Sequence, residues 1–209
     1  MNKNFILMAS AIILASAGFS SCKAQNTNSN EMTVTEALSE RHSGRSFSDK
    51  ALPQDLVMEV LWAGNGKNAH GRRTAPSAVN AQDIDLYLCT AEGVSKYNAG
   101  DTKLEKVTDE DIRPFLQAQN KFIMNAPVTI LLVSDQTKFG EPRPGSRNMN
   151  FGLVDAGIVS ENISLFCTAK GLATVCCMPR IREDEVRRAL SLSERQIPIL
   201  YHPVGYPAE

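Results

Sequence analysis

Apolar and polar side chains follow two different periods along the chain. Over residues 56–61 and 151–166, apolar side chains recur every three or four positions, as on a helix with one buried face. Over residues 83–88, apolar and polar side chains alternate, which predicts a half-buried strand. The continuous β-favouring run 127–133 predicts a central strand that is covered on both faces.

Start and stop signals complete this set of elements. Thr33 and Glu36 fit a capping box, and Pro53 suits the first turn of a helix. Thr108 precedes three acidic residues and predicts another helix start. Trp62, near the end of the second helix, is expected in the core. The expected helices are 33–41, 53–63, 108–120, 150–170 and 183–190, and the expected strands are 83–88, 94–97, 127–133, 172–179 and 197–204.

The first 22 residues have the character of a secretory leader. Lys3 precedes a mostly apolar stretch, Phe5–Phe19, that is too short for a comfortable membrane span. Small residues and then Cys22 follow, which resembles a bacterial lipoprotein signal with Cys22 as the lipidated residue, although Phe19 stands where leucine is usual. The alternative is an ordinary cleaved signal with an incidental cysteine.

Composition and length bound the rest of the chain. The 209 residues are 43% hydrophobic and 22% charged, with a formal charge of −1, so the basic surplus of a nucleic-acid-binding protein is missing. We expect a signal peptide over 1–22, a flexible polar tether over 23–32 and one folded domain over 33–209. The expected location is the cell envelope, with the membrane touched only through the N-terminal lipid.

Two short stretches carry candidate chemistry. The first, Arg41-His42-Ser43-Gly44-Arg45, combines fixed positive charge with a hydroxyl donor, which suits a phosphate group. The alternative is a solvated basic end of a helix, where cations complement the dipole. The second stretch runs from Arg72 to Gln82 and precedes the alternating strand.

With these two stretches the chain resembles the nitroreductase family, flavoproteins that bind FMN at a dimer interface. Their first motif, Arg-x-Ser-x-Arg/Lys, is filled by Arg41, Ser43 and Arg45. Their second, Pro-Ser-x-x-Asn-x-Gln, is filled from Pro76 to Gln82. The resemblance covers roughly residue 33 to the end. It implies an α+β fold, an α/β/α sandwich with a central mixed sheet flanked by helices, and a homodimer.

The resemblance also implies which residues bind the cofactor. The first stretch would hold the phosphate and ribityl, the second would hydrogen-bond the flavin, and the backbone after the long helix would pass the ring. Relatives carry a further basic residue after Gly-Tyr-Pro, so here the phosphate charge is expected to fall on the arginines. The implied cofactor-binding residues are Arg41, His42, Ser43, Arg45, Arg73, Pro76, Ser77, Ala78, Asn80, Gln82, Cys176, Cys177 and Met178.

Cys176 and Cys177 invite sharper interpretations. Adjacent cysteines cannot easily face one metal ion, no second cysteine pair exists in the sequence, and a disulfide between neighbours would be strained. We therefore expect both to be small buried side chains on a strand. No metal ligand set and no catalytic side chain is assigned.

The implied reaction is a ping-pong cycle. A donor reduces FMN by two electrons, and FMN then reduces a small molecule such as a nitroaromatic or a quinone. NAD(P)H is the usual donor of relatives but is scarce in the envelope, so the donor stays open. Two alternatives remain: an FMN-dependent dehydrogenase of peptide or heterocycle substrates, which the string Arg72–Ala78 resembles, and a catalytically inactive, surface-tethered binding protein of the same fold.

Overall fold

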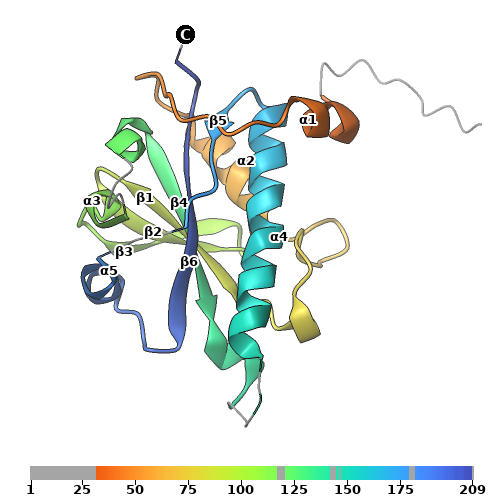
Figure 1. Cartoon of the computed structure of the whole chain (residues 1–209), viewed down its shortest axis with the longest axis vertical. Helices are drawn as coiled ribbons and strands as arrows, with labels where there is room; N and C mark the ends of the chain where they lie inside the picture. The colour runs from red at the N-terminus through yellow and green to blue at the C-terminus, as the bar shows by residue number, and fades with distance from the viewer. Residues whose placement is uncertain (1–31, 117–120, 142–144, 146, 179–181, 209) are drawn as a thin grey trace, which may run out of the picture. The chain divides into compact units, whose positions relative to one another are not determined.

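Six strands form one sheet in the order β3-β2-β1-β4-β6-β5, and every ladder between them is antiparallel (Figure 1). The computed structural model describes residues 32–116, 121–141, 145, 147–178 and 182–208. The leader, Cys22 and the tether therefore lie outside the described residues. The strands are β1 Ile84–Thr90, β2 Gly93–Asn98, β3 Lys103–Thr108, β4 Val128–Asp135, β5 Ala173–Thr174 and β6 Gln196–Gly205. The sheet expected to be mixed is thus antiparallel throughout its described ladders.

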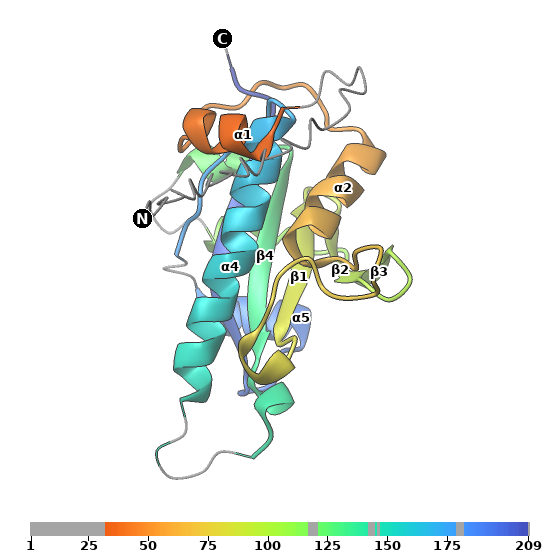
Figure 2. The ribbon, with the colours of Figure 1, turned by 90° about the vertical axis from the view of Figure 1, so that its right-hand side faces the viewer.

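Helices cover both faces of this sheet (Figures 1 and 2). The α-helices are α1 Val34–Glu40, α2 Gln54–Asn65, α3 Arg113–Leu116, α4 Asn148–Ala169 and α5 Glu183–Leu190. Helices α1, α2 and α4 lie on one side, and α3 and α5 lie on the other. The described residues also form three short 3-10 turns: η1 Ala78–Asn80, η2 Lys121–Asn125 and η3 Gln136–Phe139. The architecture is α+β with helices on both faces, which confirms the expected fold class.

The central strands feed two separate cores. On β1, Leu86 and Leu88 pack with α2 and α4, whereas Tyr87 and Cys89 point to the opposite side and pack with α3 and α5. Side chains alternate across a strand, so each strand supplies both cores. Strand β1 was expected to be half-buried but is buried on both faces, because α3 and α5 cover the side that the sequence pattern left polar.

Several local predictions are confirmed at the helix ends. Thr33 caps α1, with its side chain accepting from the Glu36 N–H while the Glu36 carboxylate accepts from the Thr33 N–H. Pro53 precedes α2, and Gly66 ends it by donating to the Trp62 carbonyl. Trp62 itself contradicts its prediction. It is 39% exposed, and its indole N–H donates to the Lys67 carbonyl, so the loop after α2 gives the indole a polar partner outside the core.

The helix expected from Thr108 is wrong. Thr108 is the last residue of β3, and its hydroxyl accepts from the Glu110 N–H in the turn that follows. Among the described residues of the segment 108–120, which end at Leu116, one helical turn, α3, forms. Strand β3 was not predicted because it is an edge strand in which three of the six residues are charged, a common way to protect an open sheet edge.

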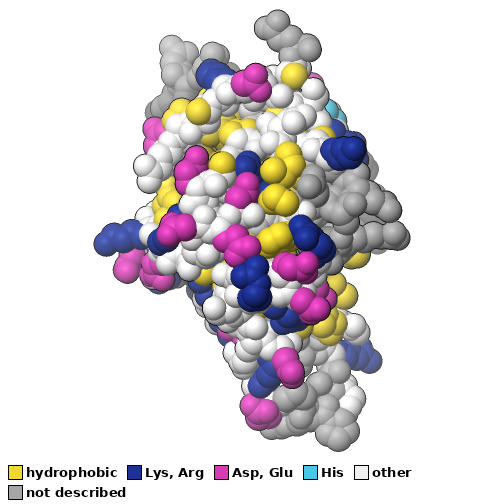
Figure 3. All heavy atoms as spheres, turned by 90° about the vertical axis from the view of Figure 1, so that its left-hand side faces the viewer, with side chains coloured by type: hydrophobic (Ala, Val, Ile, Leu, Met, Phe, Trp, Pro, Cys, Tyr) yellow, Lys and Arg dark blue, Asp and Glu magenta, His cyan; other side chains and the backbone are white. Residues whose placement is uncertain are grey.

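The outer side of the sheet near α5 carries both signs of charge. Figure 3 shows acidic and basic side chains intermixed on this face. Arg188 on α5, for example, pairs with Glu110 at 2.9 Å. Among the helices that the structure describes, none combines the length and the apolar run needed to cross a bilayer.

Candidate functional site

The first motif lies against the short strand β5. Arg41 caps the C-terminus of α1, and the stretch then turns so that the Gly44 N–H donates to the Thr174 carbonyl at 2.9 Å. A Cβ at Gly44 would lie 2.8 Å from the Ala173 Cβ, which is closer than such atoms approach. Glycine is therefore what allows the backbone of the motif to rest on β5.

The two arginines of this motif keep their charge exposed. Arg41 and Arg45 both face solvent, and neither forms an ion pair with the residues that the structure describes. Arg45 reaches back only to the Ser43 carbonyl at 3.4 Å, and the His42 ring lies 3.0 Å from the Glu40 carbonyl. Two guanidinium groups without a carboxylate partner suit an incoming phosphate.

The expected ring-facing segment lies beside this motif. The positive charge of Arg45 acts on the Cys177 thiol, although burial dominates and raises the pKa of that thiol. Cys177 is buried as expected, but Cys176 is exposed, so the prediction for that residue is wrong. The strand predicted over 172–179 is reduced to β5 and one bridge between Cys177 and Tyr201. The residues on either side of Cys176 are buried, whereas the Cys176 side chain faces solvent.

This bridge changes which backbone groups can meet a ligand. The Cys177 N–H donates to the Tyr201 carbonyl at 2.9 Å, and the Tyr201 N–H donates back at 2.8 Å. The Cys177 amide is therefore used inside the fold. Its neighbours Cys176 and Met178 carry the exposed side chains of this segment, Met178 at 69%.

A buried histidine on β6 contacts the side chain of Thr174 on β5. His202 on β6 is fully buried, with one ring nitrogen 2.8 Å from the Ser160 hydroxyl and the other 3.1 Å from the Thr174 hydroxyl. Burial lowers the pKa of His202 to about 3, so the ring is neutral near pH 7. Because the Thr174 carbonyl receives the Gly44 N–H, this polar chain connects α4 with the first motif.

The second motif forms a strained loop around η1. The φ values are 49° for Val79, 55° for Asn80 and 51° for Gln82. These lie in the left-handed region, which residues other than glycine rarely adopt. For the β-branched Val79 this conformation is a marked outlier, so the surroundings must hold it. The Ser77 hydroxyl does part of this by accepting the Gln82 N–H at 2.8 Å.

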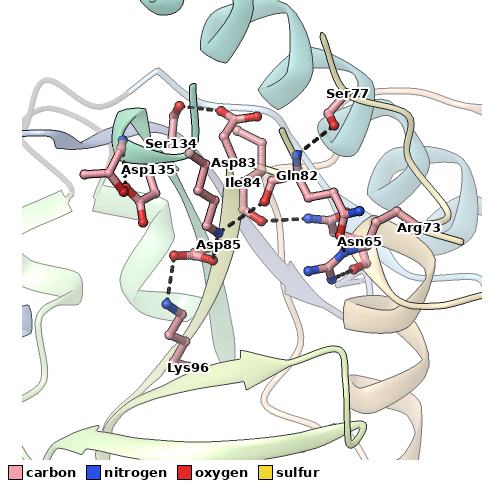
Figure 4. Close-up of polar contacts among 12 residues, drawn as sticks. Asn65, Arg73, Ser77, Gln82, Asp83, Ile84, Asp85, Lys96, Ser134 and Asp135 are labelled. Atoms are coloured by element: carbon pink, nitrogen blue, oxygen red, sulfur yellow. Dashed lines mark hydrogen bonds and ion pairs between the residues drawn. The ribbon is translucent and has the colours of Figure 1, made fainter. Parts of the chain in front are cut away.

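Arg73 also holds the loop. Its guanidinium donates to the Gln82 side chain at 3.1 Å and to the Asn65 carbonyl at 2.7 Å (Figure 4). The Gln82 amide in turn donates to the Asn80 side chain at 3.3 Å. Burial lowers the pKa of Arg73 from its ordinary value. Within this chain, the Arg73 side chain is thus bound inside the loop. The exposed positive charge that could bind a phosphate belongs to Arg41 and Arg45.

The carboxylate that anchors the loop was missed from the sequence. Both oxygens of Asp155, on α4, accept the Ala78 N–H at 3.0 Å. Asp155 is only 2% exposed. A signal existed, since Asp155 lies one turn after Phe151 and one turn before Val159, inside the apolar stripe of the predicted helix.

The two motifs do not meet within one chain. Ala78 is tied to α4 at Asp155, whereas the first motif rests on β5, just past the end of α4 (Figures 1 and 2). From Asp155 to the end of the helix at Ala169, the rise of 1.5 Å per residue gives about 20 Å. The structure therefore brings the first motif and the segment 173–178 together, and places the second motif elsewhere.

Known proteins share both the sequence pattern and the fold. Residues 38–206 match the model of the Nitroreductase family. A protein of Methanothermobacter thermautotrophicus, named NADH dehydrogenase/NAD(P)H nitroreductase, is 29% identical over 182 residues, which are 86% of this chain and 80% of that protein. A nitroreductase crystal structure from Ralstonia eutropha has a TM-score of 0.79 and 29% identity, and covers 89% of this chain and 88% of its own.

A more distant structure carries a ligand. A nitroreductase from Desulfovibrio desulfuricans, in complex with FMN, has a TM-score of 0.63 and 23% identity, and the match covers 86% of this chain and 88% of that one. At this identity the comparison shows a shared fold. The nitroreductase-like fold expected from the sequence is confirmed.

Proposed function

Because the chain belongs to the nitroreductase family, whose members are oxidoreductases, we propose that it is an FMN-dependent enzyme working in a two-electron ping-pong cycle. Its acceptors would be small molecules of the nitroaromatic or quinone class. The observation that carries the proposal is that Arg41 and Arg45 are exposed, have no ion pair among the described residues and lie beside the segment 173–178. The FMN-bound relative from Desulfovibrio desulfuricans supports the choice of cofactor.

The chain's own residues fit such a cofactor in one specific way. Arg41 and Arg45 would hold the phosphate, and Ser43 would offer its hydroxyl to the phosphate or ribityl group. Gly44 keeps the backbone low on β5, where a side chain would collide with Ala173. When bound, FMN supplies the redox chemistry, so the protein needs to bind, orient and shield it.

We also propose that two copies complete one site. The two motifs are separated by about 20 Å along α4, taken at 1.5 Å per residue, so Ser77 and Asn80 of one copy would serve the flavin held by Arg41 and Arg45 of the other. The exposed side of α4 includes an apolar stretch, with Met149, Leu153 and Val154 at 43%, 42% and 60% exposure and the open Gly157 next along. Exposed apolar faces of this kind are typical of interfaces.

The electron donor is a separate question. The relative from Methanothermobacter thermautotrophicus carries NAD(P)H in its name, which supports NADH or NADPH as the donor. If the protein is exported, that donor is scarce and another reductant would take its place. We therefore propose the half-reaction in which reduced FMN reduces the acceptor, whichever donor supplies the electrons.

A colour test examines the proposal. Purified protein, loaded with FMN if needed, is expected to be yellow, to bleach with dithionite and to regain colour when a quinone or nitroaromatic is added under anaerobic conditions. NADH and NADPH are then tested as replacements for dithionite. Colourless protein that cannot be loaded with FMN would contradict the function and favour the catalytically inactive binding protein.

We propose further that the chain is a lipoprotein of the cell envelope, anchored at Cys22. The support is the short apolar leader, the small residues before the cysteine and the polar tether after it. Wild-type protein expressed with its leader is expected to fractionate with membranes and to be released by detergent. The Cys22→Ala variant is expected in the soluble fraction or as uncleaved precursor. Identical fractionation and identical mass of the mature forms would rule out the lipid anchor.

A further inference from the structure

Two carboxyl groups meet beneath the loop of the second motif. Asp83 directly follows the loop and is 0% exposed, and Asp155 on α4 is 2% exposed. The two groups are close enough for the hydrogen bonding and the charge of Asp155 both to act on Asp83. Two buried carboxylates side by side are unfavourable unless a cation or a proton is shared between them.

The lysines nearby are engaged elsewhere. Lys138 donates to the Gln82 carbonyl at 3.1 Å and to the Asp85 carboxylate at 3.0 Å. Lys96 on β2 donates to the other oxygen of Asp85 at 2.8 Å (Figure 4). Both ammonium groups therefore bind the Asp85 carboxylate, and neither hydrogen-bonds to Asp83 or Asp155.

The arginines and the remaining acid are also occupied. Arg73 is bound to the Gln82 side chain, and Arg195, next to β6, donates to the Gln136 carbonyl at 3.0 Å. Asp135 on β4 caps η3 by accepting the Thr137 N–H. Among the described residues, no cation hydrogen-bonds to Asp83 or Asp155.

Neutral donors satisfy only part of the pair. The Ser134 hydroxyl donates to one oxygen of Asp83 and itself accepts from the Gln136 amide at 2.6 Å. The other oxygen of Asp83 accepts no hydrogen bond from the described donor groups. On α4, Gly152 makes room for this arrangement, since a Cβ there would lie 2.5 Å from the Ser134 hydroxyl. A buried oxygen without a donor partner is where a proton would be held.

We propose that Asp83 and Asp155 share one proton, and that this proton keeps the Pro76–Gln82 loop in position through the bond between Asp155 and the Ala78 N–H. With the proton present, Asp83 is neutral and donates to Asp155, which keeps its bond to Ala78. Without it, two adjacent negative charges repel each other in a buried site, and the loop loses its support. The inference depends on the proposed function only in treating this loop as part of the flavin site.

The proton is expected to titrate close to neutral pH. Burial, reinforced by the Asp155 carboxylate, raises the pKa of Asp83 from 3.8 to about 6, against the opposing bond from Ser134. The folded protein therefore binds this proton more tightly than the unfolded chain does. Its contribution to stability is complete below pH 4 and is lost as the pH rises through about 6. A difference of about two pKa units is about a hundredfold in the folding equilibrium.

Asp83→Asn separates this role from simple packing. The amide has the same size and donates to Asp155 at every pH. We would measure urea unfolding of flavin-free protein from pH 4 to 8 for wild type, Asp83→Asn and the control Asp101→Asn, an exposed aspartate in the β2–β3 turn. The variant is expected to gain stability over wild type as the pH rises, by up to about a hundredfold in the equilibrium constant, while the control follows wild type. Parallel profiles for wild type and Asp83→Asn would overturn the proposal.

The loop itself gives a second reading. In wild type, the hydrogen-exchange protection of the Ala78 N–H is expected to fall between pH 5 and 7.5, whereas in Asp83→Asn it should stay constant. In Asp155→Ala, the Ala78 N–H should lose this protection at both pH 5 and pH 7.5. Protection that is independent of pH in wild type would contradict the coupling. The FMN affinity of Asp83→Asn, divided by that of wild type at the same pH, should rise with pH. If neither wild type nor any variant binds FMN, the proposed function is wrong. The unfolding profile of the flavin-free protein still tests the shared proton.

Discussion

Alanine at Arg41 or at Arg45 is expected to weaken FMN binding about ten- to a hundredfold. Hydrogen bonds to a charged group contribute about 1.5–3 kcal/mol each, and about 1.4 kcal/mol is a factor of ten in affinity. Both side chains are exposed and unpaired within the described structure, so their removal should cost the fold little. Fluorescence titration of flavin-free protein with FMN measures the loss.

Riboflavin and Arg188 provide the controls for this experiment. Riboflavin lacks the phosphate, so its affinity should be nearly the same in wild type, Arg41→Ala and Arg45→Ala. Arg188 is an exposed arginine on α5, outside both motifs, and Arg188→Ala should leave FMN affinity unchanged. If neither Arg41→Ala nor Arg45→Ala weakens FMN, the first motif is only the basic end of α1.

Gly157→Arg is expected to make the protein, which we propose to be a homodimer, monomeric and to abolish FMN binding at micromolar protein. Gly157 lies on the exposed stripe of α4, and nothing lies within 4 Å of a Cβ built there. A larger side chain therefore fits the single chain, and arginine is a better helix former than glycine by roughly 0.7 kcal/mol. In a close interface between two helices, however, two buried arginines would face each other. Light scattering and FMN titration give both readings.

Two further substitutions make this result specific. Gly157→Ala adds only a methyl group and should remain dimeric. Val107→Arg adds the same charge on β3, at the far edge of the sheet from β5, and should also remain dimeric and bind FMN. A wild-type monomer that holds stoichiometric FMN would contradict the shared site, and so would a monomeric Gly157→Arg variant with unchanged FMN affinity.

Features that depend on neighbours in the chain could be predicted from the sequence. The start of α1 follows from Thr33 and Glu36, which satisfy each other three residues apart. The run 127–133 became β4, and the periodic stretch 150–170 became α4, because each carries enough apolar surface to define its own burial. The exposed charge of the first motif is equally local, since its residues come within five positions.

Features that depend on distant partners could not be predicted in the same way. The edge strand β3 has little apolar surface, and it forms because β2 offers a hydrogen-bonding partner. Thr108 and the residues after it satisfy the rules for a helix start, yet Thr108 is the last residue of β3 and pairs with Val94 on β2. The exposure of Trp62 and Cys176 likewise depends on loops and strands that cover, or fail to cover, each side chain.

The sequence alone predicted the family, through its resemblance to two family motifs, and the α+β fold class, through local pattern; both are confirmed. That the two arginines of the first motif hold a phosphate stays a prediction. Tertiary structure alone decided how the site is supported. Ala78 and Asp155 are 77 residues apart, and Ser160 and His202 are 42 apart. Their meeting is set by how α4 packs on the sheet, and burial then decides whether each group keeps its charge. The packing of α4 also holds the two motifs apart, because a helix of 22 residues has a fixed length that side chains cannot shorten.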